Sequence, residues 1–321
     1  MKTLTQFTCI VLATLFIAAS VLGQDAPKRK SKANAPQAGN AQRPRDQKPS
    51  WLMPPVAGPN LHYKTFESKA AGEKVSYLHY LPPDYETAKD RRYPVVYWLH
   101  GIGGGQTGIP AMAERLTKAI TAGKTPPMIV VYVNGMIRSS YVDSADGKTP
   151  VETVTIKELL PHIDATYRTI ATREGRMVEG FSMGGGGAAK WGFKHPDLFG
   201  SISIIDGALF PPDDTSGKSA ETLKTIYGGD RARFEANNPW KLAEKNAEKV
   251  KDRAAIRIVT RTTGLSGANQ KFHDHLNHLG LANELYLIPD APHSPNPLYE
   301  GLGEQNWPFY KKAFEAALAA N

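Results

Sequence analysis

The chain has 321 residues, of which 41% are hydrophobic and 22% charged, and its formal net charge is +8 at pH 7. Six of these eight net charges precede Trp51, so the basic balance does not indicate a nucleic-acid-binding domain. The one cysteine, Cys9, lies in an N-terminal apolar run. A chain that has lost this run therefore has no disulfides, no thiol catalysis and no cysteine-ligated zinc.

Residues 1–23 are predicted to be a secretory signal peptide. Lys2 precedes the apolar run "CIVLATLFIAASVL", and small residues end the segment at "VLG". The run of about 14 residues is short for a membrane span, and an uncleaved N-terminal anchor is the alternative. No second apolar stretch of spanning length follows it. We therefore expect an exported protein, periplasmic or secreted, without integral membrane association after cleavage.

Residues 24–50 are predicted to be a disordered, basic leader. They contain no aromatic residue and no Val, Ile or Leu, so they cannot bury enough apolar surface to offset the entropy of ordering. Residues 51–321 show no linker-like change in composition and no internal repeat. We expect a single domain there.

The domain begins with two alternating segments, "LHYKTFES" and "KVSYLHYLPP", which predict an antiparallel hairpin at the edge of a sheet. Six short apolar runs follow, and helical patterns such as "VTIKELLPHIDATY" lie between them. Buried strands that alternate with helices predict an α/β fold, with a mainly parallel central sheet covered by helices on both faces. The apolar runs are residues 93–101, 127–135, 175–182, 200–207, 255–261 and 283–291.

Reactive side chains in such folds lie beyond the carboxyl ends of the strands. One candidate is Ser182 in "GFSMG", between a predicted strand and a glycine-rich helix. Gly180 and Gly184 allow a sharp turn that leaves the serine exposed at its tip. We expect Ser182 to be a nucleophile and the backbone N–H of Met183 to stabilise an oxyanion. A flexible loop is the alternative, because each glycine weakens a helix by about 1 kcal/mol relative to alanine.

A second glycine-rich turn, "LHGIGGG" at residues 99–105, follows the strongest predicted strand. Its backbone N–H groups can point into the same site, and that of Ile102 is the expected second oxyanion donor. The Lys and the Ser or Thr of a phosphate-binding loop are missing here. His100 ends a buried strand and is expected to be a packed structural residue.

His293 in "PDAPHSPNP" is the expected general base. It follows the last predicted strand and lies on a proline-rich loop that has little entropy left to lose. Three other histidines, at positions 273, 275 and 278, share one predicted helix, but their spacing is not the i, i+4 pair of a zinc helix. We therefore expect no metal and no cofactor.

These features together resemble the esterase branch of the α/β-hydrolases. That branch includes feruloyl and acetylxylan esterases of carbohydrate esterase family one, S-formylglutathione hydrolases and mycolyltransferases. The resemblance runs from about Tyr77 to the C-terminus and rests on "YLPPDYE", "YPVVYWLHG", "YVDSADG", "ELLPHIDATYRT", "GFSMGGGGA", "HPDLFGSIS" and "APHSPN". It implies an α/β-hydrolase fold, with Ser182 as nucleophile and His293 as base. The amides of Ile102 and Met183 would form the oxyanion hole.

The acid that should orient the histidine is missing from its usual place. The resemblance puts it after the penultimate strand, where this chain has Thr263, and no Asp or Glu occurs between Asp252 and Asp274. Asp206 ends the preceding strand, "SISIID", and is the expected relocated acid, because a loop beyond that strand can approach the histidine from behind. Asp290 on the histidine's own loop, or the absence of any acid, are the alternatives.

The sequence thus predicts an exported serine carboxylic-ester hydrolase. Its expected partner is an ester substrate, an acylated carbohydrate or a small phenolic ester, with Tyr141 and Trp307 as candidate aromatic platforms for it. No nucleic-acid partner is expected. The alternative functions are a non-catalytic carbohydrate-binding homologue that has lost the triad acid, and an acyltransferase.

Overall fold

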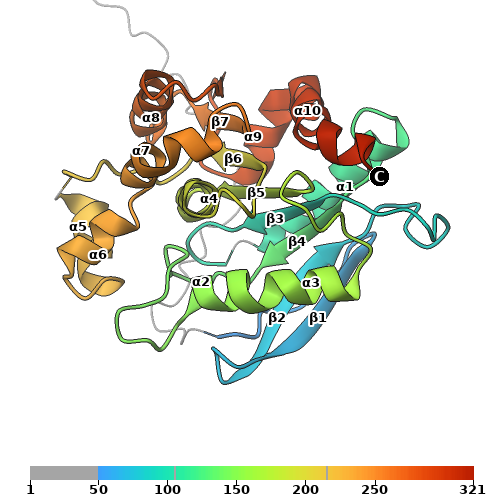
Figure 1. Cartoon of the computed structure of the whole chain (residues 1–321), viewed down its shortest axis with the longest axis horizontal. Helices are drawn as coiled ribbons and strands as arrows, with labels where there is room; N and C mark the ends of the chain where they lie inside the picture. Colours follow the sequence, from blue (N-terminus) through green and yellow to red (C-terminus); the bar gives the residue numbers. More distant parts are fainter. Residues whose placement is uncertain (1–49, 105, 215) are drawn as a thin grey trace, which may run out of the picture. The chain divides into compact units, whose positions relative to one another are not determined.

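The computed structural model describes residues 50–104, 106–214 and 216–321 (Figure 1). The predicted signal peptide, and all of the predicted leader except its last residue, lie outside the described residues. Within these described ranges, no helix is both long and apolar enough to cross a lipid bilayer.

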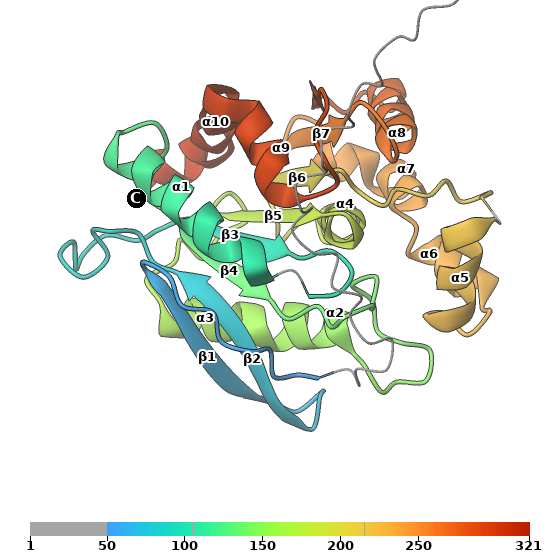
Figure 2. The same cartoon turned by 180° about the vertical axis from the view of Figure 1, so that it is seen from behind.

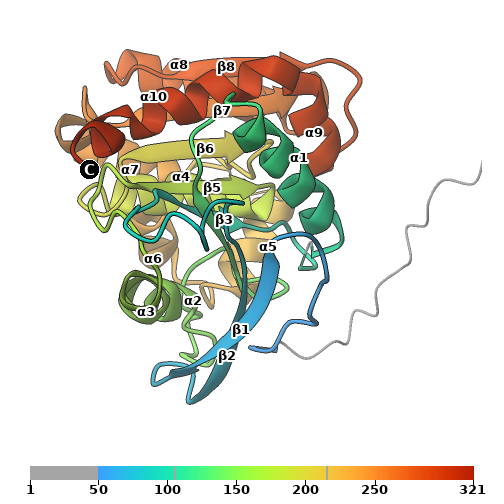
Figure 3. The same cartoon turned by 90° about the vertical axis from the view of Figure 1, so that its right-hand side faces the viewer.

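A mixed sheet of eight strands forms the centre of the structure, in the order β1-β2-β4-β3-β5-β6-β7-β8. Strands β1 and β2 form an antiparallel hairpin, β2 pairs antiparallel with β4, and the remaining pairs are parallel. Figure 3 shows the strands following one another from this hairpin to β8. The predicted edge hairpin and mainly parallel sheet are confirmed. The strands are β1 (Leu61–Ser68), β2 (Glu73–Tyr80), β3 (Val95–Leu99), β4 (Ile129–Val133), β5 (Arg176–Phe181), β6 (Ser201–Ile205), β7 (Ala255–Arg261) and β8 (Glu284–Ile288).

Helices cover both faces of the sheet, and their apolar residues fall into two core clusters. Helices α2, α3, α4, α7 and α8 pack on one face, and α1, α9 and α10 pack on the other (Figures 1 and 2). Helices α5 and α6 belong to neither layer. The helices are α1 (Ile109–Thr121), α2 (Val151–Thr153), α3 (Leu160–Thr166), α4 (Met183–Lys194), α5 (Gly217–Thr225), α6 (Arg231–Ala236), α7 (Pro239–Val250), α8 (Ser266–His278), α9 (Pro295–Leu302) and α10 (Asn306–Ala319), and a π-helical segment (Val154–Leu159) joins α2 to α3.

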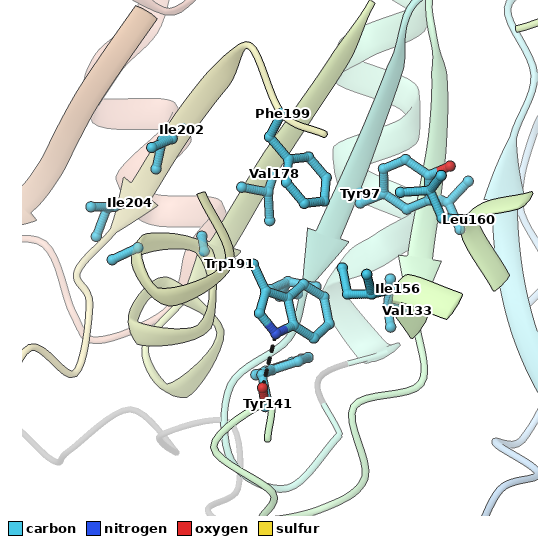
Figure 4. Packing of buried hydrophobic residues seen from close by; sticks show 14 of the residues in the cluster. Tyr97, Val133, Tyr141, Ile156, Leu160, Val178, Trp191, Phe199, Ile202 and Ile204 are labelled. Atoms are coloured by element: carbon cyan, nitrogen blue, oxygen red, sulfur yellow. Dashed lines mark hydrogen bonds between the residues drawn. The ribbon is translucent and has the colours of Figure 1, made fainter. Parts of the chain in front are cut away.

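Strand β3 shows why the sheet needs two helical layers. All five of its residues are buried: Val95, Tyr97 and Leu99 belong to one core cluster, and Val96 and Trp98 belong to the other. Successive side chains of a strand point to opposite faces, so a continuous apolar run is buried only between two layers. Figure 4 shows part of the first cluster.

A buried ion pair lies in the second cluster. The guanidinium of Arg257 in β7 donates a hydrogen bond to the carboxylate of Glu179 in β5, with Nη2 and Oε2 2.8 Å apart. Their side chains are 0% and 3% exposed. Tyr299 of α9 and Tyr310 of α10 donate hydrogen bonds to the same carboxylate, at 2.7 and 3.0 Å. The ion pair therefore connects the centre of the sheet to the two C-terminal helices.

We expect Arg257→Met to lower the free energy of unfolding by about 3–5 kcal/mol, because it leaves a buried carboxylate without its charged partner. The double variant Glu179→Gln, Arg257→Met should lose less than the sum of the two single variants. Urea unfolding measures both effects. Lys241→Met, which breaks an exposed pair with Glu244, is the control and should cost less than about 1 kcal/mol. A similarly small cost for Arg257→Met would contradict the expectation.

Candidate active site

The turn between β5 and α4 holds Ser182 in a strained backbone conformation, with φ 57° and ψ −114°. A non-glycine residue in such a conformation costs about 1–3 kcal/mol and persists only where its neighbours hold it. The Ser182 N–H donates to the Ile205 carbonyl at 3.0 Å, and the Ser182 carbonyl accepts from the Ala208 N–H at 2.8 Å. The segment that follows β6 therefore holds the serine in place.

Gly180 and Gly184 are required by close backbone contacts at this turn. A Cβ atom at Gly184 would lie 2.0 Å from the Leu99 carbonyl oxygen. A Cβ atom at Gly180 would lie 2.1 Å from the Gly184 carbonyl oxygen. Any side chain at either position would push α4 away from the ends of β3 and β5, so only glycine allows the helix to begin there.

His293 lies on the loop between β8 and α9 and contacts both Ser182 and Asp206. Its Nε2 atom is 2.8 Å from Ser182 Oγ, and its Nδ1 atom is 2.6 Å from Asp206 Oδ2. An ionised carboxylate only accepts hydrogen bonds, so Nδ1 is the donor, and Nε2 of the neutral ring is left to accept from the serine. The imidazole also packs on the Phe181 ring, with centroids 4.7 Å apart, which restricts its rotation.

Asp206 follows β6 with a φ of 43° and is fully buried. Its Oδ1 atom accepts a hydrogen bond from the Thr260 hydroxyl at 2.7 Å. Its Oδ2 atom accepts from Arg261 Nε at 2.9 Å in addition to His293. Two residues of strand β7 therefore hold the carboxylate in the position where it accepts a hydrogen bond from the histidine.

These partners decide the protonation state of Asp206. Burial by itself raises the pKa of the carboxyl group. The hydrogen bonds from His293 and Thr260, together with the positive charge of Arg261 and that of the His293 ring when it is protonated, outweigh burial and lower the pKa of Asp206 below its ordinary value of 3.8. Asp206 is therefore ionised throughout the neutral range, as an acceptor for an imidazole N–H must be.

We expect the stability contributed by Asp206 to depend on pH in one direction. A carboxyl group with a lowered pKa in the folded chain stabilises the fold above its ordinary pKa, and this contribution is lost as the pH falls through the lowered value. Asp206→Asn should therefore lower the free energy of unfolding most near neutral pH, and this loss should shrink as the pH falls below about 4. Urea unfolding of both proteins across this range measures it. A cost that grows on acidification would contradict the lowered pKa.

The two expected oxyanion amides belong to residues beside Ser182. Ile102 lies in the turn after β3, Met183 is the first residue of α4, and both line the same cavity as Ser182 and His293. Among the described residues, neither N–H donates to a backbone carbonyl outside the regular elements. The Gly103 N–H donates to the Ile137 carbonyl at 3.0 Å and holds the first turn. Within the part of the chain that the structure describes, this lack of such a carbonyl partner is what the expected role of the two amides requires.

A cavity of about 660 Å³ opens beside these side chains. One wall is α4, and another is the segment from Phe210 to Asn238, which contains α5 and α6. Figures 1 and 2 show α5 and α6 apart from the helices that cover the sheet. The segment forms a small core cluster, in which Ile226, Tyr227 and Phe234 pack with Val142. The insertion between β6 and β7 therefore provides much of the cavity wall.

Two other positions bear on the identity of the acid: Thr263, at the place where the resemblance puts it, and Asp290, on the histidine's own loop. Thr263 and Asp290 are both exposed, and in the described ranges neither is a hydrogen-bond partner of His293. The carboxylate that contacts the imidazole is that of Asp206. The geometry thus brings together the three side chains expected from the sequence, Ser182, His293 and Asp206.

Tyr141 and Trp307 do not line the cavity, so the expectation that they form aromatic platforms for the substrate is wrong. Tyr141 is fully buried, its hydroxyl donates to the His100 carbonyl at 3.0 Å, and the Trp191 indole donates to the Tyr141 carbonyl at 2.9 Å (Figure 4). A Cβ atom at Gly135 would lie 2.3 Å from the Tyr141 ring, so the glycine makes room for it. Trp307 is 7% exposed and packs in the second core cluster. Both rings bury apolar area in the cores.

His100 and His273 make structural contacts. His100 is buried, its Nε2 atom accepts from the Gly135 N–H at 3.1 Å, and its Nδ1 atom donates to the Gly101 carbonyl at 2.7 Å. His273 in α8 lies 2.6 Å from the amide oxygen of Asn283. Within the ranges that the structure describes, no three His, Cys, Asp or Glu side chains are arranged to hold a metal ion.

Sequence reasoning missed Thr260, Arg261 and Lys190, which all lie at the site. The sequence could have indicated the role of Arg261. Residues 253–273 contain several basic residues and no acid. A buried arginine in β7 must therefore find its acidic partner on a neighbouring strand. Lys190 carries no such signal, because a lysine on a helix is ordinarily exposed. The structure shows it 95% buried, with 5% of its surface exposed in the cavity wall.

A strained serine after a parallel strand, a histidine after the last strand and a mixed sheet between two helical layers define an α/β-hydrolase. Residues 68–320 match the family model described as "Putative esterase". The chain belongs to this family.

Two curated relatives show how far the similarity extends. An esterase of Mycobacterium tuberculosis is 32% identical over 255 residues, which are 72% of this chain and 55% of the relative. An endo-1,4-beta-xylanase/feruloyl esterase of Xylanibacter ruminicola is 31% identical over 178 residues, which are 53% of this chain and 24% of the relative. The chain thus spans about half the length of the first relative and about a quarter of the second.

Solved structures share the fold. A ferulic acid esterase superposes with a TM-score of 0.66 at 24% identity, covering 79% of this chain and 98% of that one. An S-formylglutathione hydrolase from Agrobacterium tumefaciens superposes with a TM-score of 0.62 at 18% identity, covering 79% of this chain and 95% of that one. At these identities the likeness establishes the α/β-hydrolase fold.

Proposed function

We propose that the chain is a serine carboxylic-ester hydrolase, with Ser182 as nucleophile, His293 as general base and Asp206 as the acid of the triad. The observation that carries this proposal is the continuous series of contacts from Ser182 Oγ through the imidazole to the buried carboxylate, at 2.8 and 2.6 Å. Membership in an esterase family supports an ester as the bond that is broken. The contact between the His293 imidazole and the Asp206 carboxylate argues against the alternative, a binding protein that has lost the triad acid.

The reaction follows from this geometry. Ser182 Oγ attacks the ester carbonyl carbon while its proton passes to Nε2 of His293. Asp206 stabilises the imidazolium that forms, and the amides of Ile102 and Met183 hold the oxyanion. The imidazolium then gives its proton to the leaving alcohol, and an acyl-enzyme remains. Water, activated by the same histidine, releases the acid.

The substrate belongs to the phenolic esters or acylated carbohydrates. Ferulic acid esterases among the similar proteins support this class, and the cavity volume of about 660 Å³ suits a ligand of this size. We also propose that residues 51–321 are the esterase domain. In this proposal, residues 1–23 direct its export, and residues 24–50 are a basic leader between the signal peptide and the domain.

We expect the purified chain to hydrolyse p-nitrophenyl acetate and methyl ferulate, and Ser182→Ala to lower kcat by at least about 10³-fold, because the nucleophile is lost. Release of p-nitrophenol and of ferulate, measured spectrophotometrically, gives the rates. Turnover by the wild type no faster than by Ser182→Ala would overturn the esterase proposal and favour a non-catalytic carbohydrate-binding role.

The identity of the acid is tested by comparing Asp206→Asn with Asp290→Asn. Asp206→Asn should lower kcat by about 10²–10⁴-fold, since it removes the charge that stabilises the imidazolium and disturbs the tautomer. Asp290 is exposed, so its variant should change kcat by less than about threefold. Circular dichroism confirms that both variants are folded at the assay temperature. Equal and mild effects would show that neither aspartate is the partner of His293.

A further inference from the structure

We propose that the cavity binds an ester that carries a carboxylate group, and that Lys190 is the residue that binds this carboxylate. The proposal rests on the ester hydrolysis proposed above and adds the charge class of the substrate.

Helix α4 places Lys190 in the same cavity as the nucleophile. Met183, Gly186 and Lys190 all line the cavity, and their spacing of three and four residues puts them on one face of the helix. The cavity that these residues line therefore extends along this face from Ser182 to Lys190. Eight residues rise about 12 Å along a helix, and the lysine side chain leans back toward its N-terminus. The ammonium group therefore lies roughly 6–12 Å from the nucleophile.

Lys190 is a buried cation without an acidic partner. Its residue is 5% exposed, and Nζ donates to the Ser140 carbonyl at 2.7 Å and to the Tyr227 hydroxyl at 3.4 Å. Both acceptors are neutral, and in the described ranges no carboxylate lies within ion-pair distance of it. An ammonium has three donors, so one remains for a ligand.

The protein bears an energetic cost at Lys190 that a bound anion would remove. Burying a charge without a counter-charge is unfavourable. Burial lowers the pKa of Lys190 to about 7, the charge of Glu152 opposes this shift, and the charge of Lys194 adds to it. A substrate carboxylate beside Nζ would form the missing ion pair and favour the protonated amine.

The other charged groups of the cavity wall point to the same class of ligand. Arg138, Lys218 and Arg261 also line the cavity, and the described lining contains one acid, Glu221. Arg138 is paired with Glu221 at 2.5 Å, and Arg261 is paired with the carboxylate of Asp206. Lys190 and Lys218 have no acidic partner within the described lining, and Lys218 is exposed, so solvent screens its charge. The cavity is thus electropositive, which attracts anionic substrates and repels cationic ones.

Pairs of esters that differ in one carboxylate test the proposal on the wild-type chain. On the acyl side, the p-nitrophenyl monoester of adipic acid is compared with p-nitrophenyl hexanoate. On the alcohol side, 4-acetoxycinnamic acid is compared with its primary amide, which has no carboxylate and no second ester. In at least one pair we expect kcat/KM to be about tenfold or more higher for the anionic ester. The pair that responds tells which part of the substrate carries the carboxylate.

Lys190→Met keeps the length of the side chain and removes the charge, so the preference for the anionic ester should fall by at least about tenfold. Lys190→Arg keeps the charge and should retain part of the preference. Lys218→Met is the matched control: it removes an exposed charge from the same cavity wall, and the preference should change by less than about threefold.

Each outcome decides between the two proposals. Ser182-dependent hydrolysis of p-nitrophenyl acetate without an anion preference in either pair would overturn the carboxylate site and leave the esterase standing. Equal losses in Lys190→Met and Lys218→Met would overturn the role of Lys190. If no ester is hydrolysed, the esterase proposal fails. The carboxylate site is then tested by calorimetry, which measures the affinities of Ser182→Ala for the adipate and hexanoate esters. Tighter binding of the adipate ester would support the site. Equal affinities there would overturn it.

Discussion

The buried carboxylate of Asp206 accepts hydrogen bonds from Thr260 and Arg261 at the end of β7 and from His293 after β8. The segment 205–208 that carries it also holds the nucleophile, because Ile205 and Ala208 make the backbone hydrogen bonds to Ser182. One short segment after β6 therefore positions both ends of the proposed triad. Since a buried charge is costly without its partners, the neighbouring strands and loops must stay in place for this segment to be stable.

Two arginines of strand β7 form ion pairs, one in the core and one at the candidate active site. Arg257 and Arg261 are four residues apart, so their side chains leave the strand on the same face. Arg257 pairs with Glu179 inside the core, and Arg261 pairs with Asp206 at the edge of the sheet. Both carboxylates lie on or directly after other strands of the parallel sheet. The basic strand β7 can therefore be buried although it contains no acid, because its arginines pair with carboxylates from neighbouring strands.

Much of the fold and part of the site could be predicted from the sequence. The strands follow from short apolar runs, and the motif around Ser182 depends on glycines two residues away on either side. His293 is recognised by its place after the last strand. The burial of Tyr141 and Lys190 could not be predicted. Tyr141 is buried because Gly135 leaves room for its ring. Lys190 is buried because its ammonium donates hydrogen bonds to the Ser140 carbonyl and the Tyr227 hydroxyl.

The sequence by itself determined the features that depend on neighbours along the chain: the alternation of strands and helices, and the turn that only glycines at 180 and 184 permit. The tertiary structure alone decided which charges meet. Asp206 and His293 are 87 residues apart and come within 2.6 Å because β6, β7 and β8 lie side by side in the sheet. Charge pairing and burial act through space, so the order of strands selects Asp206 as the partner of the histidine and leaves Lys190 facing the cavity without one.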